Sequence, residues 1–139
     1  MSALLHLHGV RVLIVDDARD VRAVVSEILE RDGAAVIAVD SAERALEVVQ
    51  RERPDVLLSD LSMPSKGGYW LIGQVRALAA EHGGATPAAA LTAYAGAEHR
   101  ASVLRAGFQE HIVKPVAMRK LIDVVATLAR VPYPSSVAP

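Results

Sequence analysis

The chain has 139 residues, of which 52% are hydrophobic and 22% are charged, so it has the length of one globular domain and enough apolar residues for a core. The formal net charge of -1 gives no general reason to expect direct binding to nucleic acid, and the absence of cysteine excludes disulfides and thiolate metal sites. The first ten residues have no basic region and too short an apolar run for a signal peptide, and no stretch approaches the roughly 20 apolar residues that cross a bilayer, so we expect a cytoplasmic protein without a membrane partner.

The first half of the chain alternates short apolar runs with helix-periodic segments. Arg11–Val15 is β-branched and nearly continuous, which predicts a strand buried on both faces. Apolar residues recur at helical spacing over 21–29. A second strand fits Ala34–Val39, and Ser41 is the expected N-cap of a helix that runs over 42–50.

The same alternation continues in the second half. Asp55–Ser59 predicts a third strand, and a Gly-Gly pair opens a helix over 68–79. Pro87–Leu91 is weak by propensity, because alanine is a poor strand former, and is predicted as a strand from its place in the alternation. The remaining elements are a helix over 97–106, a strand at His111–Val113 and a helix over 117–130. The predicted division is an N-terminal extension (1–9), one domain (10–130) and a disordered tail (131–139).

Five strands alternating with five helices predict an α/β fold with a doubly wound parallel sheet, covered on both faces. Ligands bind such sheets beyond the carboxyl ends of the strands. Polar residues stand there: Asp16 and Asp17 after the first strand, Asp60 after the third, Thr92 after the fourth and Lys114 after the fifth. Each also fits a turn, a cap or a solvated strand end. Their joint order is far more specific and predicts that they converge on one mouth.

The predicted set has a chemical logic. Three carboxylates in one place repel each other unless a cation neutralises them. Magnesium is a hard cation that takes oxygen ligands, and a lysine adds a compact positive charge. A phosphoryl group on one carboxylate could lie against the metal, the ammonium and the hydroxyl, which is the arrangement that phosphoryl transfer requires.

Four segments carry a resemblance to a known family: VLIVDD (12–17), LLSDLSMPSKGGY (57–69), ALTAYA (90–95) and GFQEHIVKPV (107–116). They resemble the receiver domain of response regulators in two-component signalling, and the last two look most like receivers attached to hybrid histidine kinases. The resemblance covers about residues 10–130. It implies a flavodoxin-like (βα)5 fold with strand order 2-1-3-4-5.

The resemblance also implies a metal-dependent phosphoacceptor. Asp60 would take a phosphoryl group from the phosphohistidine of a histidine kinase or histidine phosphotransfer domain. Asp16, Asp17 and Asp60 would ligate Mg²⁺ (or Mn²⁺), together with the backbone carbonyl of Ser62. The side chain of Ser62 stands at a position that controls access of the hydrolytic water.

Other positions would respond to phosphorylation. Lys114 would pair with the phosphoryl group, and Pro115 matches a position that commonly carries a cis peptide bond. Thr92 would be the switch hydroxyl and Tyr94 would shield the acyl phosphate. His111 would fill the space that Thr92 vacates; the alternative is a half-buried strand histidine without a switching role. The switching face, also the expected surface of a homodimer, would be the fourth helix, fifth strand and fifth helix.

On this interpretation the chain is not an enzyme, except that it promotes its own phosphoryl transfer and dephosphorylation. Two alternative functions stay open. A haloacid-dehalogenase-type phosphatase also forms an aspartyl phosphate, but its nucleophile follows the first strand in an Asp-x-Asp pattern, whereas here that strand ends in adjacent aspartates. A pseudo-receiver adaptor would bind partners without phosphorylation, and it would not need all five polar residues.

Overall fold

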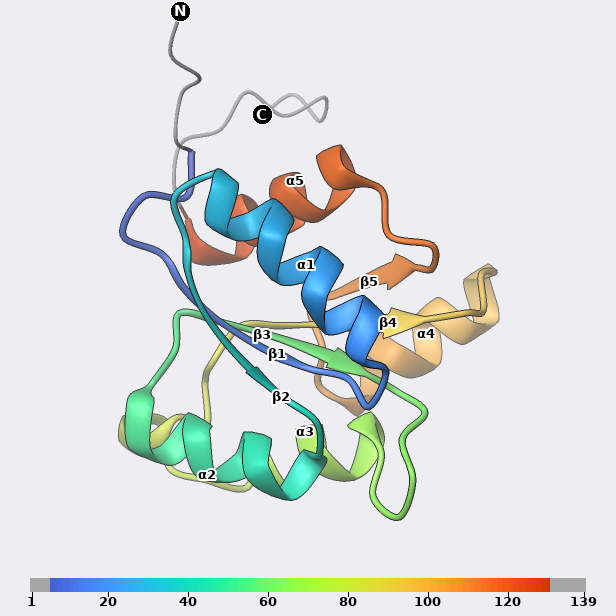
Figure 1. Ribbon diagram of the computed structural model, residues 1–139. Coiled ribbons are helices and arrows are strands. Elements are labelled where there is room, and N and C mark those ends of the chain that lie inside the picture. Colours follow the sequence, from blue (N-terminus) through green and yellow to red (C-terminus); the bar gives the residue numbers. More distant parts are fainter. Residues whose placement is uncertain (1–5, 131–139) are drawn as a thin grey trace, which may run out of the picture.

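A five-stranded parallel sheet organises residues 6–130, the part of the chain that the computed structural model describes (Figure 1). The sheet order is β2-β1-β3-β4-β5, and every pair of neighbouring strands is parallel. The predicted fold and strand order are therefore confirmed, and each predicted strand boundary lies within one residue of the observed one. The strands are β1 (Arg11–Val15), β2 (Ala35–Val39), β3 (Val56–Asp60), β4 (Ala88–Thr92) and β5 (Glu110–Val113).

Five α-helices cover the two faces of the sheet. They are α1 (Arg19–Arg31), α2 (Ala42–Glu52), α3 (Gly68–Arg76), α4 (Ala97–Ala106) and α5 (Met118–Ala129), with a short 3₁₀ helix η1 (Ala80–His82) after α3. One apolar cluster joins α1 and α5 to the sheet, and a second joins α2, α3 and α4 to the opposite face (Figure 1). As predicted, Ser41 caps α2, because its hydroxyl accepts a hydrogen bond from the Arg44 N–H at 3.3 Å.

Strand β4 forms because of its central position in the sheet, although its alanine residues have a low strand propensity. Its residues Ala88–Thr92 are all buried, and the strand lies between β3 and β5 in the sheet. Because both its edges and both its faces are occupied, the hydrogen-bonded ladder and the burial stabilise an extended conformation that alanine alone would not favour. The weak strand prediction is thus confirmed, and β4 carries Thr92 to the same edge of the sheet as the ends of β1 and β3.

Ordered packing begins before β1. Leu7 lies within the predicted N-terminal extension, yet its side chain is fully buried and its N–H donates to the Asp32 carbonyl at 2.9 Å. The predicted division at residue 10 stays a prediction, and the predicted tail over 131–139 lies outside the described residues. Among residues 6–130, none of the helices combines the length and the apolar character needed to span a bilayer.

Candidate functional site

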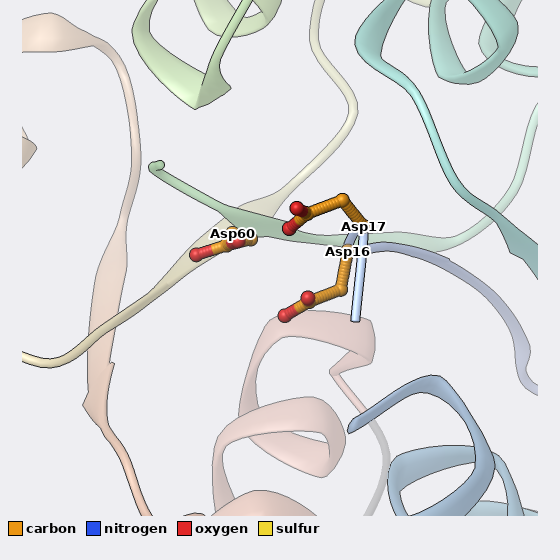
Figure 2. A group of neighbouring side chains, drawn as sticks. All are labelled: Asp16, Asp17 and Asp60. Carbon is orange, nitrogen blue, oxygen red and sulfur yellow. The ribbon is translucent and has the colours of Figure 1, made fainter. Parts of the chain in front are cut away.

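Three aspartates meet where the strand order reverses. The connection from β1 to β2 carries α1 on one face of the sheet, while the connection from β3 to β4 carries α3 on the other. Parallel sheets leave a crevice at such a switch point. Asp16 and Asp17 follow β1 and Asp60 ends β3, and one carboxylate oxygen of each lies within 4.8 Å of the others (Figure 2).

The carboxylate of Asp16 is buried but has partners. Asp16 is 0% exposed. Its Oδ1 accepts a hydrogen bond from the Ala18 N–H at 2.8 Å, and its Oδ2 accepts one from Lys114 Nζ at 2.9 Å. The Arg22 guanidinium donates to the Asp16 backbone carbonyl at 2.8 Å, which holds α1 against the end of β1. A buried charge needs such partners, and here both carboxylate oxygens are satisfied.

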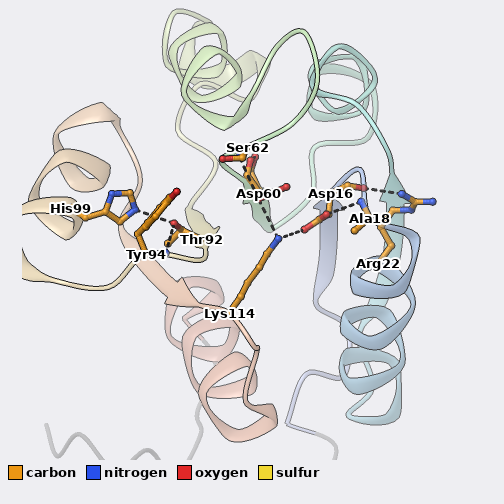
Figure 3. Close-up of polar contacts among 10 residues, drawn as sticks. Asp16, Ala18, Arg22, Asp60, Ser62, Thr92, Tyr94, His99 and Lys114 are labelled. Atoms are coloured by element: carbon orange, nitrogen blue, oxygen red, sulfur yellow. Dashed lines mark hydrogen bonds and ion pairs between the residues drawn. The ribbon is translucent and has the colours of Figure 1, made fainter.

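Lys114 bridges the two buried carboxylates. It follows β5, which is separated from β3 by β4, so its side chain reaches across the end of β4 to the aspartates (Figure 3). Its Nζ lies 2.9 Å from Asp16 Oδ2 and 3.2 Å from Asp60 Oδ1. Burial lowers the pKa of Lys114, but the hydrogen bonds and charges of both aspartates outweigh it and raise the pKa above its ordinary value. The Lys114–Pro115 peptide bond is cis, as the resemblance implied.

The environment of Asp60 disfavours its ionised form. Burial and the nearby charge of Asp16 raise the pKa of Asp60 above the ordinary aspartate value, although Lys114 and the Ser62 N–H oppose the rise. Asp60 is only 6% exposed, so solvent relieves little of this cost. One ammonium is therefore not enough to neutralise the cluster, and a further cation would stabilise it.

We predict that Asp60→Asn stabilises the protein against unfolding near neutral pH in metal-free buffer. Folding raises the pKa of Asp60, so the free energy of unfolding falls as the pH rises from the unfolded pKa of this carboxyl through its folded pKa. The uncharged amide in Asp60→Asn does not titrate, so the variant avoids this loss. The gain should shrink as the pH falls below that window. Urea titrations at several pH values test this, with exposed Glu47→Gln as the matched control. A gain that persists unchanged at acidic pH would contradict the electrostatic explanation.

The aspartates open into a cleft of about 300 Å³. Its walls include the predicted access residues Ser62 and Tyr94 and the predicted switch residue Thr92. The Ser62 N–H donates to Asp60 Oδ1 at 3.4 Å, while Tyr94 is 66% exposed at the rim. The structure thus brings these residues to the cleft; the roles expected for them stay predictions.

A second cluster lies on the α4 side of the cleft. The Oγ1 of buried Thr92 accepts a hydrogen bond from the Tyr94 N–H at 3.1 Å and lies 3.0 Å from His99 Nε2 (Figure 3). His111 is 8% exposed, and its Nε2 lies 3.1 Å from the Tyr94 carbonyl oxygen. Because a carbonyl only accepts, His111 donates this bond.

Sequence reasoning missed His99. No motif marks it, because it is one polar residue near the start of an ordinary helix. The predicted helix over 97–106 could have given a clue, since its first turn must lie near the end of the fourth strand. The structure shows that His99 on α4 contacts Thr92.

Comparisons with known proteins agree with this geometry. The family described as response regulator receiver domain matches residues 12–126. An uncharacterised 14.6 kDa protein in the sodA1 3′ region of Leptolyngbya boryana is 44% identical over 114 residues, 82% of this chain and 86% of that protein. The sensor protein GacS of Pseudomonas syringae pv. syringae is 38% identical over 116 residues, which are 83% of this chain but 13% of GacS.

A solved structure extends the comparison. The receiver domain of the sensor histidine kinase PA1611 from Pseudomonas aeruginosa PAO1 matches with a TM-score of 0.79 and 29% identity, over 88% of this chain and 98% of that chain. That crystal structure has a magnesium ion coordinated in its active site cleft.

Proposed function

The chain belongs to the response regulator receiver domain family of two-component systems, and from this premise we propose that Asp60 is its phosphoacceptor. The observation that carries the proposal is the position of the Asp60 carboxylate. It lies at the cleft, beside two other carboxylates and 3.2 Å from a lysine ammonium. Phosphoryl transfer needs an accessible nucleophile and positive charge for the phosphoryl oxygens; the Asp60 carboxylate at the cleft and the Lys114 ammonium supply these two features.

The proposed reaction exchanges one bond for another. An Asp60 carboxylate oxygen attacks the phosphorus of a phosphohistidine and forms a P–O bond. The P–N bond breaks, and the imidazole leaves with its electron pair. Lys114 already contacts Asp60 Oδ1, so a small movement of Nζ would bring it to a phosphoryl oxygen. The Thr92 hydroxyl lines the same cleft and can donate one hydrogen bond to another oxygen.

The donor set fits Mg²⁺. Three carboxylates supply hard oxygen ligands within one small volume. Burial, and after it the charge of Asp16, raise the pKa of Asp60 despite Lys114, and a bound cation would favour the ionised form. Asp16, Asp17 and Asp60 would hold the ion, together with the backbone carbonyl of Ser62. When bound, the ion supplies positive charge that stabilises the phosphoryl oxygens. Mn²⁺ has similar ligand preferences and is an acceptable substitute.

Proposed partners follow from the family. The phosphoryl donor is a histidine kinase or a histidine phosphotransfer domain, a choice supported by the similarity to the sensor protein GacS. Because the chain spans 13% of GacS, the activity of a whole kinase is not carried over. The readout face would be α4, β5 and α5, where Leu104, Val113 and Met118 are exposed apolar residues. A homodimer through that face stays a prediction.

Of the two alternative functions, a phosphatase and an adaptor that works without phosphorylation, membership of the receiver family is compatible with the adaptor. The phosphatase interpretation needs a nucleophile after the first strand in an Asp-x-Asp pattern, whereas the family that matches residues 12–126 is that of receiver domains. An adaptor that works without phosphorylation keeps the same fold, so only chemistry separates it from the proposed function. The five polar residues at one cleft favour a phosphoacceptor, because carboxylates that repel each other would not help an adaptor that works without phosphorylation. They are Asp16, Asp17, Asp60, Thr92 and Lys114.

Exposure to phosphodonors tests the proposal. We expect the purified protein to gain one phosphoryl group from acetyl phosphate in the presence of Mg²⁺, and none when a chelator removes the metal. A phosphorylated histidine phosphotransfer domain should serve as a second donor. Intact mass spectrometry measures the gain. A wild-type protein that stays unmodified with both donors would favour the adaptor.

A further inference from the structure

The half-buried imidazole of His99 lies at the switch hydroxyl and has no part in the proposed transfer. We infer that His99 is a positioning residue: it holds the Thr92 hydroxyl on the α4 side of the cleft and so restrains phosphorylation of Asp60. The inference deepens the proposed function and rests on it. In Figure 3, His99 and Asp60 lie on opposite sides of Thr92, and the dashed bond from Thr92 runs toward His99.

The contact with His99 occupies one of the hydrogen-bonding sites of the Thr92 hydroxyl. A threonine hydroxyl has one proton to donate and two sites that accept. The Tyr94 N–H occupies one accepting site at 3.1 Å, and His99 Nε2 lies 3.0 Å from the same oxygen. If Nε2 accepts, it takes the only proton of Thr92. If Nε2 donates, it takes the second accepting site. In both cases two partners on the α4 side hold Oγ1.

A phosphoryl group on Asp60 would also bind the Thr92 hydroxyl. Phosphoryl oxygens only accept hydrogen bonds, so Thr92 must direct its proton toward Asp60 in order to bind one. A rotation of the Thr92 side chain toward Asp60 would break the contact with His99. His99 and the phosphoryl group therefore compete for one side chain, and the bond to His99 favours the unphosphorylated arrangement.

The competing imidazole is itself held in place. The His99 ring makes edge-on contacts with Tyr94, at 5.7 Å between ring centroids, and with His111, at 5.5 Å. The His111 ring in turn donates to the Tyr94 carbonyl at 3.1 Å. Ring and hydrogen-bond contacts thus link Tyr94, His99 and His111 into one group beside Thr92. Release of Thr92 would free one side of this group, on the face where α4 meets β5.

The size of the effect follows from the value of one hydrogen bond. A single bond of this kind changes an equilibrium by about two- to tenfold. We therefore expect His99→Leu, which keeps a comparable volume without a polar atom, to speed phosphorylation by acetyl phosphate by about two- to tenfold. His99→Gln places an amide near the position of Nε2 and should return the rate toward that of the wild type.

A first arm of the test needs no phosphoryl donor. NMR of the unphosphorylated protein measures the rotamer of the Thr92 side chain through the three-bond couplings of its methyl carbon, a readout that loss of the His99 ring current does not change. The rotamer population should move toward Asp60 in His99→Leu and return in His99→Gln, while His82→Leu at an exposed site should leave it unchanged. An unchanged Thr92 rotamer in His99→Leu would overturn the inference, even if the wild type failed to be phosphorylated and the proposed function fell separately.

A second arm uses a double-mutant cycle. Removal of the hydroxyl in Thr92→Val leaves His99 nothing to hold, so adding His99→Leu to that variant should not change the phosphorylation rate further. An equal acceleration with and without the Thr92 hydroxyl would show that His99 acts through general packing, and would overturn the inference. Circular dichroism confirms that each variant compared is folded.

Discussion

Replacing Lys114 with alanine should lower the rate of Asp60 phosphorylation by about a hundredfold or more, the usual cost of losing one preorganised charge at a transition state. The ammonium lies 2.9 Å from Asp16 and 3.2 Å from Asp60, so it offsets part of the negative charge at the proposed acceptor. Without it, two buried carboxylates face the incoming phosphoryl oxygens. Intact mass spectrometry of samples quenched at successive times after addition of acetyl phosphate and Mg²⁺ measures the phosphorylation rate.

The same substitution should leave metal binding intact. Loss of a positive charge makes the cluster more negative, so the Mg²⁺ affinity of Lys114→Ala, measured by titration calorimetry, should equal or exceed that of the wild type. Lys120→Ala removes an equal charge from an exposed site on α5 and should change neither quantity. A phosphorylation rate within twofold of the wild type in Lys114→Ala would remove Lys114 from the proposed transfer.

Replacing Asp17 with asparagine should weaken Mg²⁺ binding by at least about tenfold, since even changes to groups behind metal ligands cost this much. Asp17 is exposed, and within residues 6–130 its side chain makes no hydrogen bond or ion pair with another residue. Its carboxylate nevertheless lies with those of Asp16 and Asp60, within 4.8 Å. Because this carboxylate adds repulsion to the cluster, the proposed role of Asp17 is to bind the cation that offsets it.

Calorimetry and unfolding together test the role of Asp17. Asp17→Asn should bind Mg²⁺ weakly, and because phosphorylation depends on the metal it should also be phosphorylated slowly. Its free energy of unfolding in metal-free buffer should not fall. Asp20→Asn, at an exposed site in the first turn of α1, is the matched control. Unchanged Mg²⁺ affinity in Asp17→Asn would exclude Asp17 from the metal site.

The sheet and the acidic cluster could be predicted because both depend on local patterns. Strands buried on both faces appear in the sequence as continuous apolar runs, and a polar residue directly after such a run must lie at the carboxyl edge. Asp16, Asp60 and Lys114 were located in this way. Their convergence needed only the strand order, which the family resemblance implied and the structure confirms.

The second cluster could not be predicted, because it depends on how α4 lies against the sheet. A helix pattern over 97–106 places the first turn near the end of the fourth strand but gives no crossing angle, so it does not predict that His99 in particular contacts Thr92. The packing of Leu7 was missed for a similar reason, since one apolar residue before a strand has no periodicity. His111 is buried and bonded to the Tyr94 carbonyl, and its switching role stays a prediction.

The central claim is that Asp60 accepts the phosphoryl group, and one pair of mass spectra tests it most directly. Wild type and Asp60→Asn are incubated side by side with acetyl phosphate and Mg²⁺, and their intact masses are compared. We predict a gain of one phosphoryl group in the wild type and no gain in Asp60→Asn. An equal gain in both proteins, or none in the wild type, would contradict the claim.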